Sequence, residues 1–190
     1  MKIGRLLLRL TVGGFFFGHG TQKLFGWFGG SGLDATAKGF EAIGLRPGKP
    51  NALAAGLAEA GGGALLVAGL ETPLAASVLT ATMLTAINRV HAKNGPWLSK
   101  GGYEYNAVLI AAAIALVEVG PGAMSVDGAR GRERSGPLWA LAALTAGALG
   151  AAGAHLAASA QPAPQELPTE QAGASDPDDQ GSPAYAPDPD

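Results

Sequence analysis

Ionisable and amide side chains recur at the ends of apolar segments in this sequence. His19, Gln22 and Lys23 close the first segment at spacings of three and four residues, which places them on one face of a helix. Glu59 is the single charge of the second segment. Imidazole titrates near neutrality, so histidines beside carboxyl and tyrosyl groups can exchange protons with a lipid-soluble redox carrier such as a quinone. We predict catalytic roles, as a proton or quinone site, for His19, Glu59, His91 and Glu104, and cofactor contacts for Gln22, Lys23, Asn88, Arg89, Tyr103 and Asn106.

Five apolar segments are suited to position these side chains as membrane-spanning helices. A hydrocarbon core about 30 Å thick needs roughly 20 helical residues. The segments are Ile3 to Leu24, Ala52 to Leu70, Thr72 to Val90, Tyr103 to Val119 and Pro137 to Ala160. If the spans alternate in direction, the polar residues of the first four share one leaflet. The predicted fold is all-α, a polytopic membrane helical bundle with a four-helix core plus a fifth C-terminal transmembrane helix.

Glu59 is the residue whose placement is most informative. A charge at membrane depth costs roughly 2.5 to 3.5 kcal/mol on insertion scales, so such groups face a bundle interior, pair with one another and mark functional paths. The natural partners of Glu59 are Lys23, Arg89 or a protonated His19. Simpler roles remain open, because Lys23, Arg89 and Lys93 near span ends can be snorkelling anchors and each histidine can be a helix-to-helix hydrogen-bonding residue. No metal site is predicted, since the two histidines and Glu59 come from three segments without diagnostic spacing.

Composition excludes several classes of function. Only 15% of residues are charged, against about a quarter in an ordinary globular chain. A net charge of -2 offers no basic stripe for nucleic acid, so no nucleic-acid partner is expected. The absence of cysteine removes disulfides, thiol redox relays, cysteine-ligated iron–sulfur clusters and c-type haem. No haem or iron–sulfur ligation is therefore expected, and any electron transfer must use another carrier.

The segments outside the spans also carry predictions. Phe40 and Ile43 lie three apart with charges on other faces, which predicts a short helix in the membrane interface, anchored by Trp27 and Phe28. After Ala160 the chain has seven acidic residues and no basic ones, which predicts a disordered tail.

Localisation and orientation follow from the same patterns. We predict a multi-pass protein of the bacterial cell (inner) membrane, in contact with the lipid bilayer. The basic N-terminus and apolar run resemble a signal peptide without a cleavage pattern, so we expect an uncleaved first span. Six basic residues lie on the side of the N-terminus and seven on the other, which is close to a tie. We favour a cytoplasmic N-terminus because those on the other side cluster beside polar groups.

Several motifs in order make this sequence resemble the DoxX family over roughly residues 4–128. These motifs are residues 19–26, 28–32, 40–47, 54–62, 89–95, 101–106 and 120–122. The resemblance implies a four-helix bacterial membrane protein related to a subunit of a thiosulfate:quinone oxidoreductase. We therefore divide the chain into a DoxX-like four-helix membrane domain at 1–128, a linker and fifth transmembrane helix at 129–160, and the acidic tail at 161–190.

Three functions are compatible with this reading. The first is a subunit of a membrane redox assembly that passes electrons or protons to quinone at the polar cluster, with a protein partner supplying the redox cofactor. The second is a non-catalytic scaffold whose polar cluster holds the bundle together. The third is a small transporter, which ranks last because no inverted repeat is visible.

Overall fold

The computed structural model describes residues 3–160, and the predicted tail at 161–190 lies outside the described residues. Within residues 3–160 every regular element is helical and no strand occurs, which confirms the predicted all-α class. The α-helices are α1 (Ile3–Phe25), α2 (Gly32–Ala42), α3 (Gly48–Ala68), α4 (Thr72–Ala86), α5 (Glu104–Val119), α6 (Val126–Ala129) and α7 (Pro137–Ser159). A π-helical turn, Ile87–His91, continues α4, and short 3₁₀ turns occur at Trp27–Gly29, Ala92–Asn94 and Leu98–Lys100.

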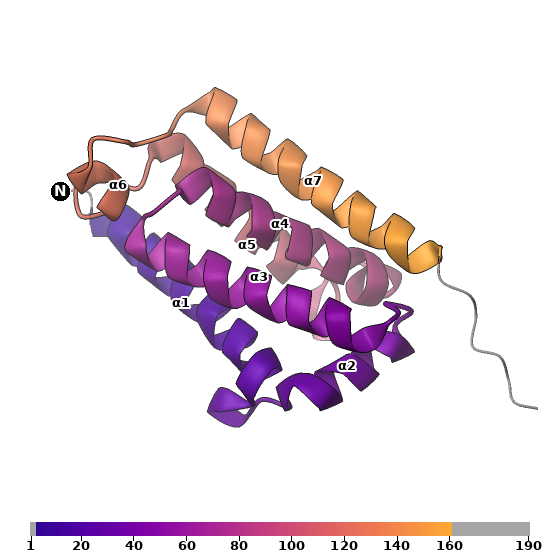
Figure 1. Cartoon of the computed structure of the whole chain (residues 1–190). Coiled ribbons are helices and arrows are strands. Elements are labelled where there is room, and N and C mark those ends of the chain that lie inside the picture. Colours follow the sequence, from indigo (N-terminus) through magenta and orange to yellow (C-terminus); the bar gives the residue numbers. More distant parts are fainter. Residues whose placement is uncertain (1–2, 161–190) are drawn as a thin grey trace, which may run out of the picture.

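Four long helices form a closed ring of neighbours. Helix α1 packs on α3, α3 on α4, α4 on α5, and α5 returns to α1. Helix α7 lies outside this ring, along α4 and α5, while α2 crosses the end of the bundle against α3 and α1 (Figure 1). The start of α1 and the end of α7 lie at opposite ends of the bundle (Figure 1).

Glycines allow α1 and α3 to approach until their backbones touch. A Cβ atom on Gly20 would lie 2.2 Å from the backbone nitrogen of Ala60, and one on Gly63 would lie 2.4 Å from that of Phe17. A Cβ on Gly13 would lie 2.8 Å from the Gly63 carbonyl oxygen, and one on Gly56 would lie 2.7 Å from the Leu24 side chain. Small residues are the usual means of association where lipid removes the hydrophobic drive between helices. At Gly20 and Gly63, where the close atoms belong to backbone, no side chain larger than hydrogen fits without moving one helix.

The ring encloses an apolar core. Its fully or almost fully buried members come from α1, α3, α4 and α5 and are Val12, Phe16, Leu66, Ala75, Leu79, Met83 and Leu116. A smaller cluster, including Ala76, Val117 and Ala143, seals α7 against α4 and α5. Together the clusters join α1, α3, α4, α5 and α7 through buried apolar contacts.

Helix α2 is fastened to the start of α3 by polar contacts. The Lys49 ammonium hydrogen-bonds to the Asp34 carboxylate at 2.8 Å, and this contact lowers the pKa of Asp34. The Glu41 carboxylate accepts a hydrogen bond from the backbone N–H of Gly48 at 3.0 Å. The short helix predicted around Phe40 and Ile43 is present as α2, and both of these side chains line a cavity inside the bundle.

Arg9 fastens the opposite end of the bundle. Its guanidinium is buried and donates to the carbonyl of Pro121 at 2.6 Å and to that of Met124. Gly69 ends α3 in the left-handed conformation, and a Cβ there would lie 2.7 Å from Nη1 of Arg9. Arg9 thus joins the start of α1 to the segment that follows α5, and its role is structural.

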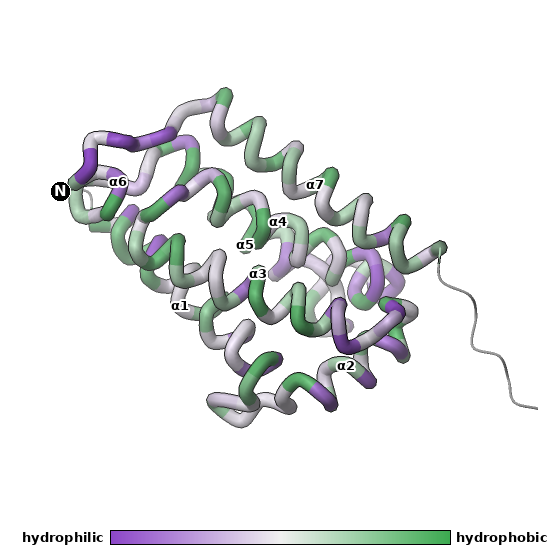
Figure 2. Tube along the Cα trace, in the orientation of Figure 1, coloured by the Kyte–Doolittle hydropathy of each residue, from purple (hydrophilic) through white to green (hydrophobic). Residues whose placement is uncertain are grey.

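Hydropathy separates the helices into two groups. Helices α3 (Gly48–Ala68) and α7 (Pro137–Ser159) are long and apolar enough to cross a membrane. Helix α4 has 15 residues before its π turn and α5 has 16, while α1 carries Arg5, Arg9 and Lys23. Hydrophilic segments gather toward the two ends of the bundle (Figure 2). Of the five predicted spans, the second (α3) and the fifth (α7) meet the length and composition of a membrane helix, and the other three do not.

The glycine contact yields a stability prediction. Gly20→Ala should lower the unfolding free energy by about 2 kcal/mol, because the added methyl group meets the α3 backbone. Gly18→Ala is the matched control on the same helix, where a Cβ meets nothing within 4 Å. Thermal or denaturant unfolding in detergent measures both. Equal stability of the two variants would contradict the close-contact account.

Candidate functional site

One cavity of about 390 Å³ lies inside the end of the ring that α2 covers. Side chains from α1, α2, α3, α4 with its π turn, and α5 all reach it. Its apolar lining includes Phe16, Phe40, Ile43, Leu45, Val90 and Leu109, and its polar lining includes His19, Lys23, Glu59, Thr82, His91, Tyr105 and Asn106. An apolar chamber with a few convergent polar groups has the size and character of a small-molecule site.

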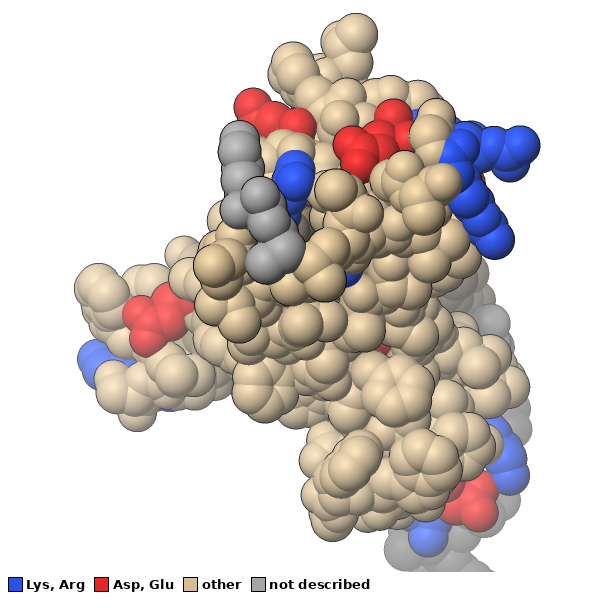
Figure 3. Space-filling model, turned by 90° about the vertical axis from the view of Figure 1, so that its left-hand side faces the viewer, with Lys and Arg blue, Asp and Glu red and all other residues tan. Residues whose placement is uncertain are grey.

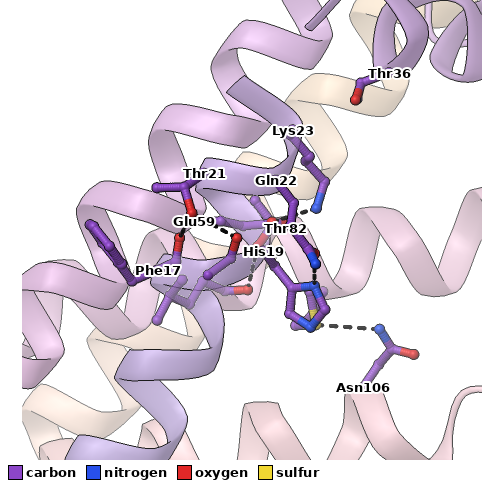
Figure 4. Close-up of polar contacts among 12 residues, drawn as sticks. Phe17, His19, Thr21, Gln22, Lys23, Thr36, Glu59, Thr82 and Asn106 are labelled. Atoms are coloured by element: carbon purple, nitrogen blue, oxygen red, sulfur yellow. Dashed lines mark hydrogen bonds and ion pairs between the residues drawn. The ribbon is translucent and has the colours of Figure 1, made fainter. Parts of the chain in front are cut away.

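A buried ion pair joins α1 to α3 at this cavity. The Lys23 ammonium lies 2.5 Å from the Glu59 carboxylate, and the two side chains are 26% and 6% exposed. Lys23 stands one turn beyond Gly20, where α1 touches α3, so its side chain has only a short distance to cross. Figure 4 shows the two groups meeting between the helices. The other ion pairs within residues 3–160, Asp34–Lys49 and Glu71–Arg134, lie at the surface.

His19 is held in one tautomer by its neighbour on the helix. Its Nδ1 lies 3.1 Å from Oε1 of Gln22, and the Gln22 amide donates to the carbonyl of Phe28 at 3.3 Å. The amide oxygen can only accept, so Nδ1 carries the proton and Nε2 is left as a free acceptor. The ring lies on the side of α1 that faces Asn106 (Figure 4). Gln22 itself does not line the cavity.

His91 has the same arrangement on the opposite wall. It ends the π-helical turn, and its Nδ1 donates to the carbonyl of Gly101 at 2.8 Å. Its Nε2, like that of His19, has no hydrogen-bond partner among residues 3–160. Two imidazoles oriented in this way can each accept a proton at the unpaired nitrogen. The cavity therefore has two proton acceptors on different helices.

Asn106 completes the polar wall from the first turn of α5. It is buried, and its amide donates to the sulfur of Met83 at 3.3 Å. Thioether sulfur is a weak acceptor, so the amide can exchange this contact for a stronger one. Tyr105 lines the cavity beside it. The sequence analysis selected Tyr103 instead, although the one-face spacing of residues 105, 106 and 109 was a usable signal.

The structure places the other predicted site residues away from this cavity. Glu104 accepts a hydrogen bond from the backbone N–H of Leu98 at 2.7 Å and holds the preceding loop. Tyr103 stands at the N-cap of α5. Asn88 and Arg89 line a separate cavity against α7, together with His155. Arg89 is two residues from His91, so the two side chains leave the helix on nearly opposite faces although they are close in sequence.

Within residues 3–160 no group of three or more histidine, aspartate or glutamate side chains lies close enough to hold a metal ion. Five of the ten predicted residues, His19, Lys23, Glu59, His91 and Asn106, share one cavity. Sequence analysis missed its apolar walls, because Phe16, Met83 and Leu109 look like ordinary core positions. Phe40 and Ile43 were noted there only as members of an interfacial helix.

Comparisons with known proteins give the family. The family model described as DoxX matches residues 4–92. The Bacillus subtilis (strain 168) protein named Putative oxidoreductase CatD is 32% identical over 117 residues, which is 60% of this chain and 79% of that protein. The chain belongs to the DoxX family. No solved structure matches it.

The region matched by the DoxX model contains most but not all of the residues that line the cavity. Residues 4–92 contain His19, Lys23, Glu59 and His91, whereas Asn106 and the whole of α5 and α7 lie beyond it. Family membership, together with the two apolar helices, makes this a membrane-associated DoxX-like protein. Helix α7 is an addition outside the matched DoxX region.

The ion pair of this DoxX protein yields a prediction by double substitution. Lys23→Met leaves Glu59 buried without a partner and should cost about 3 kcal/mol of unfolding free energy. Glu59→Gln should cost roughly 1 kcal/mol, because the partly exposed ammonium can reach water. The double variant should be more stable than Lys23→Met alone. Denaturant unfolding of all four proteins in one detergent measures the coupling, and strictly additive effects would exclude it.

Proposed function

We propose that this DoxX protein is a multi-pass subunit of a redox assembly in the bacterial cell membrane and that its cavity binds a quinone. The observation that carries the proposal is the chamber itself. It combines a buried Lys23–Glu59 pair, two histidines with unpaired ring nitrogens and an apolar lining.

The outer surface supports a lipid environment for more than the two most apolar helices. Large apolar side chains are exposed along the whole of α7, among them Leu138, Leu141, Leu149 and Leu156. Helices α1, α3 and α5 expose others, including Leu7, Phe15, Leu57 and Val108. On the face seen in Figure 3 the middle is almost free of charge, and Lys, Arg, Asp and Glu gather at the margins. Water-soluble monomers rarely present apolar surface on this scale, whereas bilayer helices require it.

The lining residues fit a quinone headgroup in size and chemistry. A volume of about 390 Å³ accommodates a one- or two-ring headgroup, with Phe16, Phe40 and Leu109 as apolar walls. Asn106 and the Lys23 ammonium are the hydrogen-bond donors that ring carbonyls need. A quinone takes up two electrons and two protons on reduction. The cavity therefore has donors that can hydrogen-bond to the ring carbonyls, and it has histidines that can exchange the two protons.

Each polar residue has a distinct role in this proposal. His19 and His91 accept or release protons at Nε2, because Nδ1 of each ring is committed to an oxygen acceptor. Glu59 keeps Lys23 in place and offsets its charge within the chamber. Gln22 holds the His19 ring and is a positioning residue rather than a catalytic one.

Electrons come from elsewhere in this proposal. The chain has no cysteine to ligate an iron–sulfur cluster or to attach haem covalently. A partner oxidoreductase that carries its own cofactor is therefore part of the proposed assembly. The name of the Bacillus subtilis relative, Putative oxidoreductase CatD, agrees with a redox role.

A labelling scan tests the membrane arrangement. The chain is free of cysteine, so single cysteines need no background removal. Cysteines at exposed Ser31 and Ser99 should react with an impermeant maleimide from one side of the membrane, and one at Gly131 from the other side only. With a cytoplasmic N-terminus, the first two label in intact spheroplasts. Labelling of all three from one side would contradict the multi-pass arrangement.

Co-purification tests the quinone site. Wild type extracted in mild detergent should retain quinone, and Glu59→Gln should retain about tenfold less, since a buried charged hydrogen bond contributes roughly 1.5 to 3 kcal/mol. Glu118→Gln is the matched control, because Glu118 is exposed near the other end of the bundle. Quinone is measured by chromatography of organic extracts.

The same preparations separate the redox proposal from the scaffold alternative. If wild type and Glu59→Gln both lack quinone but capture the same proteins, the protein is a scaffold and the quinone site is wrong. Quinone retained equally by wild type, Glu59→Gln and Glu118→Gln would place the bound molecule outside this chamber.

A further inference from the structure

A second cavity lies on the outer side of α4, between its π turn and α7. Its volume is about 440 Å³, and it is lined by Leu84, Thr85, Ile87, Asn88, Arg89, Ala151, Ala152 and His155. Asn88, Arg89 and His155 stand toward the end of the bundle, and the aliphatic residues lie deeper along the helices. The cavity is therefore polar near the bundle end and apolar toward the middle.

Arg89 is the unusual member of this lining. Its Nε is buried and has no hydrogen-bond partner, and Nη2 donates to the His155 carbonyl at a long 3.3 Å. That carbonyl already accepts from the hydroxyl of Ser159 at 2.9 Å. No carboxylate pairs with Arg89 among residues 3–160. Among residues 3–160 this guanidinium therefore has an unused donor and no counter-ion, and an anion would supply the missing partner.

The geometry points to a phosphate as that partner, and we propose that the α4–α7 cavity binds the phosphate of an anionic phospholipid. Guanidinium groups match phosphate oxygens in a bidentate manner, and Asn88 adds an amide donor. Leu84, Ile87, Ala151 and Ala152 provide the apolar wall on which an acyl chain would lie. Basic pockets between membrane helices on one side of a bilayer bind anionic headgroups.

The proposal rests on the bundle being in a membrane but not on the quinone chamber. His91 and Arg89 leave the π turn on opposite sides, so the two cavities share a wall without sharing these residues. The second cavity needs α7, which lies outside the region matched by the DoxX family model. It is thus a property of this chain that family membership does not imply.

Lipid retention tests the proposal. The full chain is reconstituted in phosphatidylcholine vesicles that contain a minority of phosphatidylglycerol and is then extracted in mild detergent. Native mass spectrometry identifies the lipid that stays bound. Wild type should retain phosphatidylglycerol in preference, and Arg89→Gln should retain about fivefold less, as expected for one basic residue. Arg134→Gln removes the same charge from a surface pair with Glu71 at the other end and should retain as much as wild type.

A second pair of variants tests the cavity without changing charge. Ala151→Leu fills the cavity and should release the lipid, while Ala146→Leu on the exposed side of α7 should not. Equal retention by wild type, Arg89→Gln and Ala151→Leu would overturn the proposal. A rise in melting temperature with inorganic phosphate that needs Arg89, without retained lipid, would assign the site to free phosphate and overturn the lipid assignment.

Discussion

The close contact between α1 and α3 is the constraint on which the rest of the site depends. Gly20 and Gly63 let the two backbones meet at distances that exclude any side chain on either glycine. That proximity brings the Lys23 ammonium within reach of Glu59, which would otherwise be a buried carboxylate far from any cation. The buried carboxylate of Glu59 thus depends on the glycine contact, because that contact brings its partner Lys23 close enough to pair with it.

The chamber beside this contact combines two environments. Phe16, Phe40 and Leu109 make most of it apolar, whereas the ion pair, the histidines and Asn106 occupy its walls at particular points. Each histidine is oriented by an oxygen acceptor at Nδ1, so the second ring nitrogen is available in a known position. Among residues 3–160 the Nε2 atoms of these two histidines have no hydrogen-bond partner, and the Asn106 amide donates only to a thioether sulfur.

Helix α4 separates two cavities of different character. Its π turn directs His91 inward and Arg89 outward against α7. π turns disturb helix geometry and are frequent at functional sites, which agrees with the presence of a lining residue on each side. The DoxX match covers the π turn and both histidines and the ion pair of the inner cavity, whereas α7, which forms one wall of the outer cavity, lies beyond the matched region.

The sequence by itself determined the helices, their order and the costly residues among them. Segments predicted at Ile3 to Leu24 and Pro137 to Ala160 are helices within one residue of those bounds, because long apolar runs of small residues leave the backbone no other way to satisfy its hydrogen bonds. Sequence reasoning also selected Lys23 as a partner for Glu59. It could not decide between Lys23, Arg89 and His19, since that choice depends on which helices touch.

Tertiary structure decided which face of each helix meets the chamber. Arg89 is two residues from His91 and Glu104 is two residues from Asn106, but Arg89 contacts α7 and Glu104 accepts from a loop backbone, because residues two apart on a helix point in nearly opposite directions. The apolar walls were equally hidden from sequence, because Phe40 and Met83 become walls only when α2 and α4 pack around the same space. Periodicity specifies the helices, and the packing of helices against one another specifies the site.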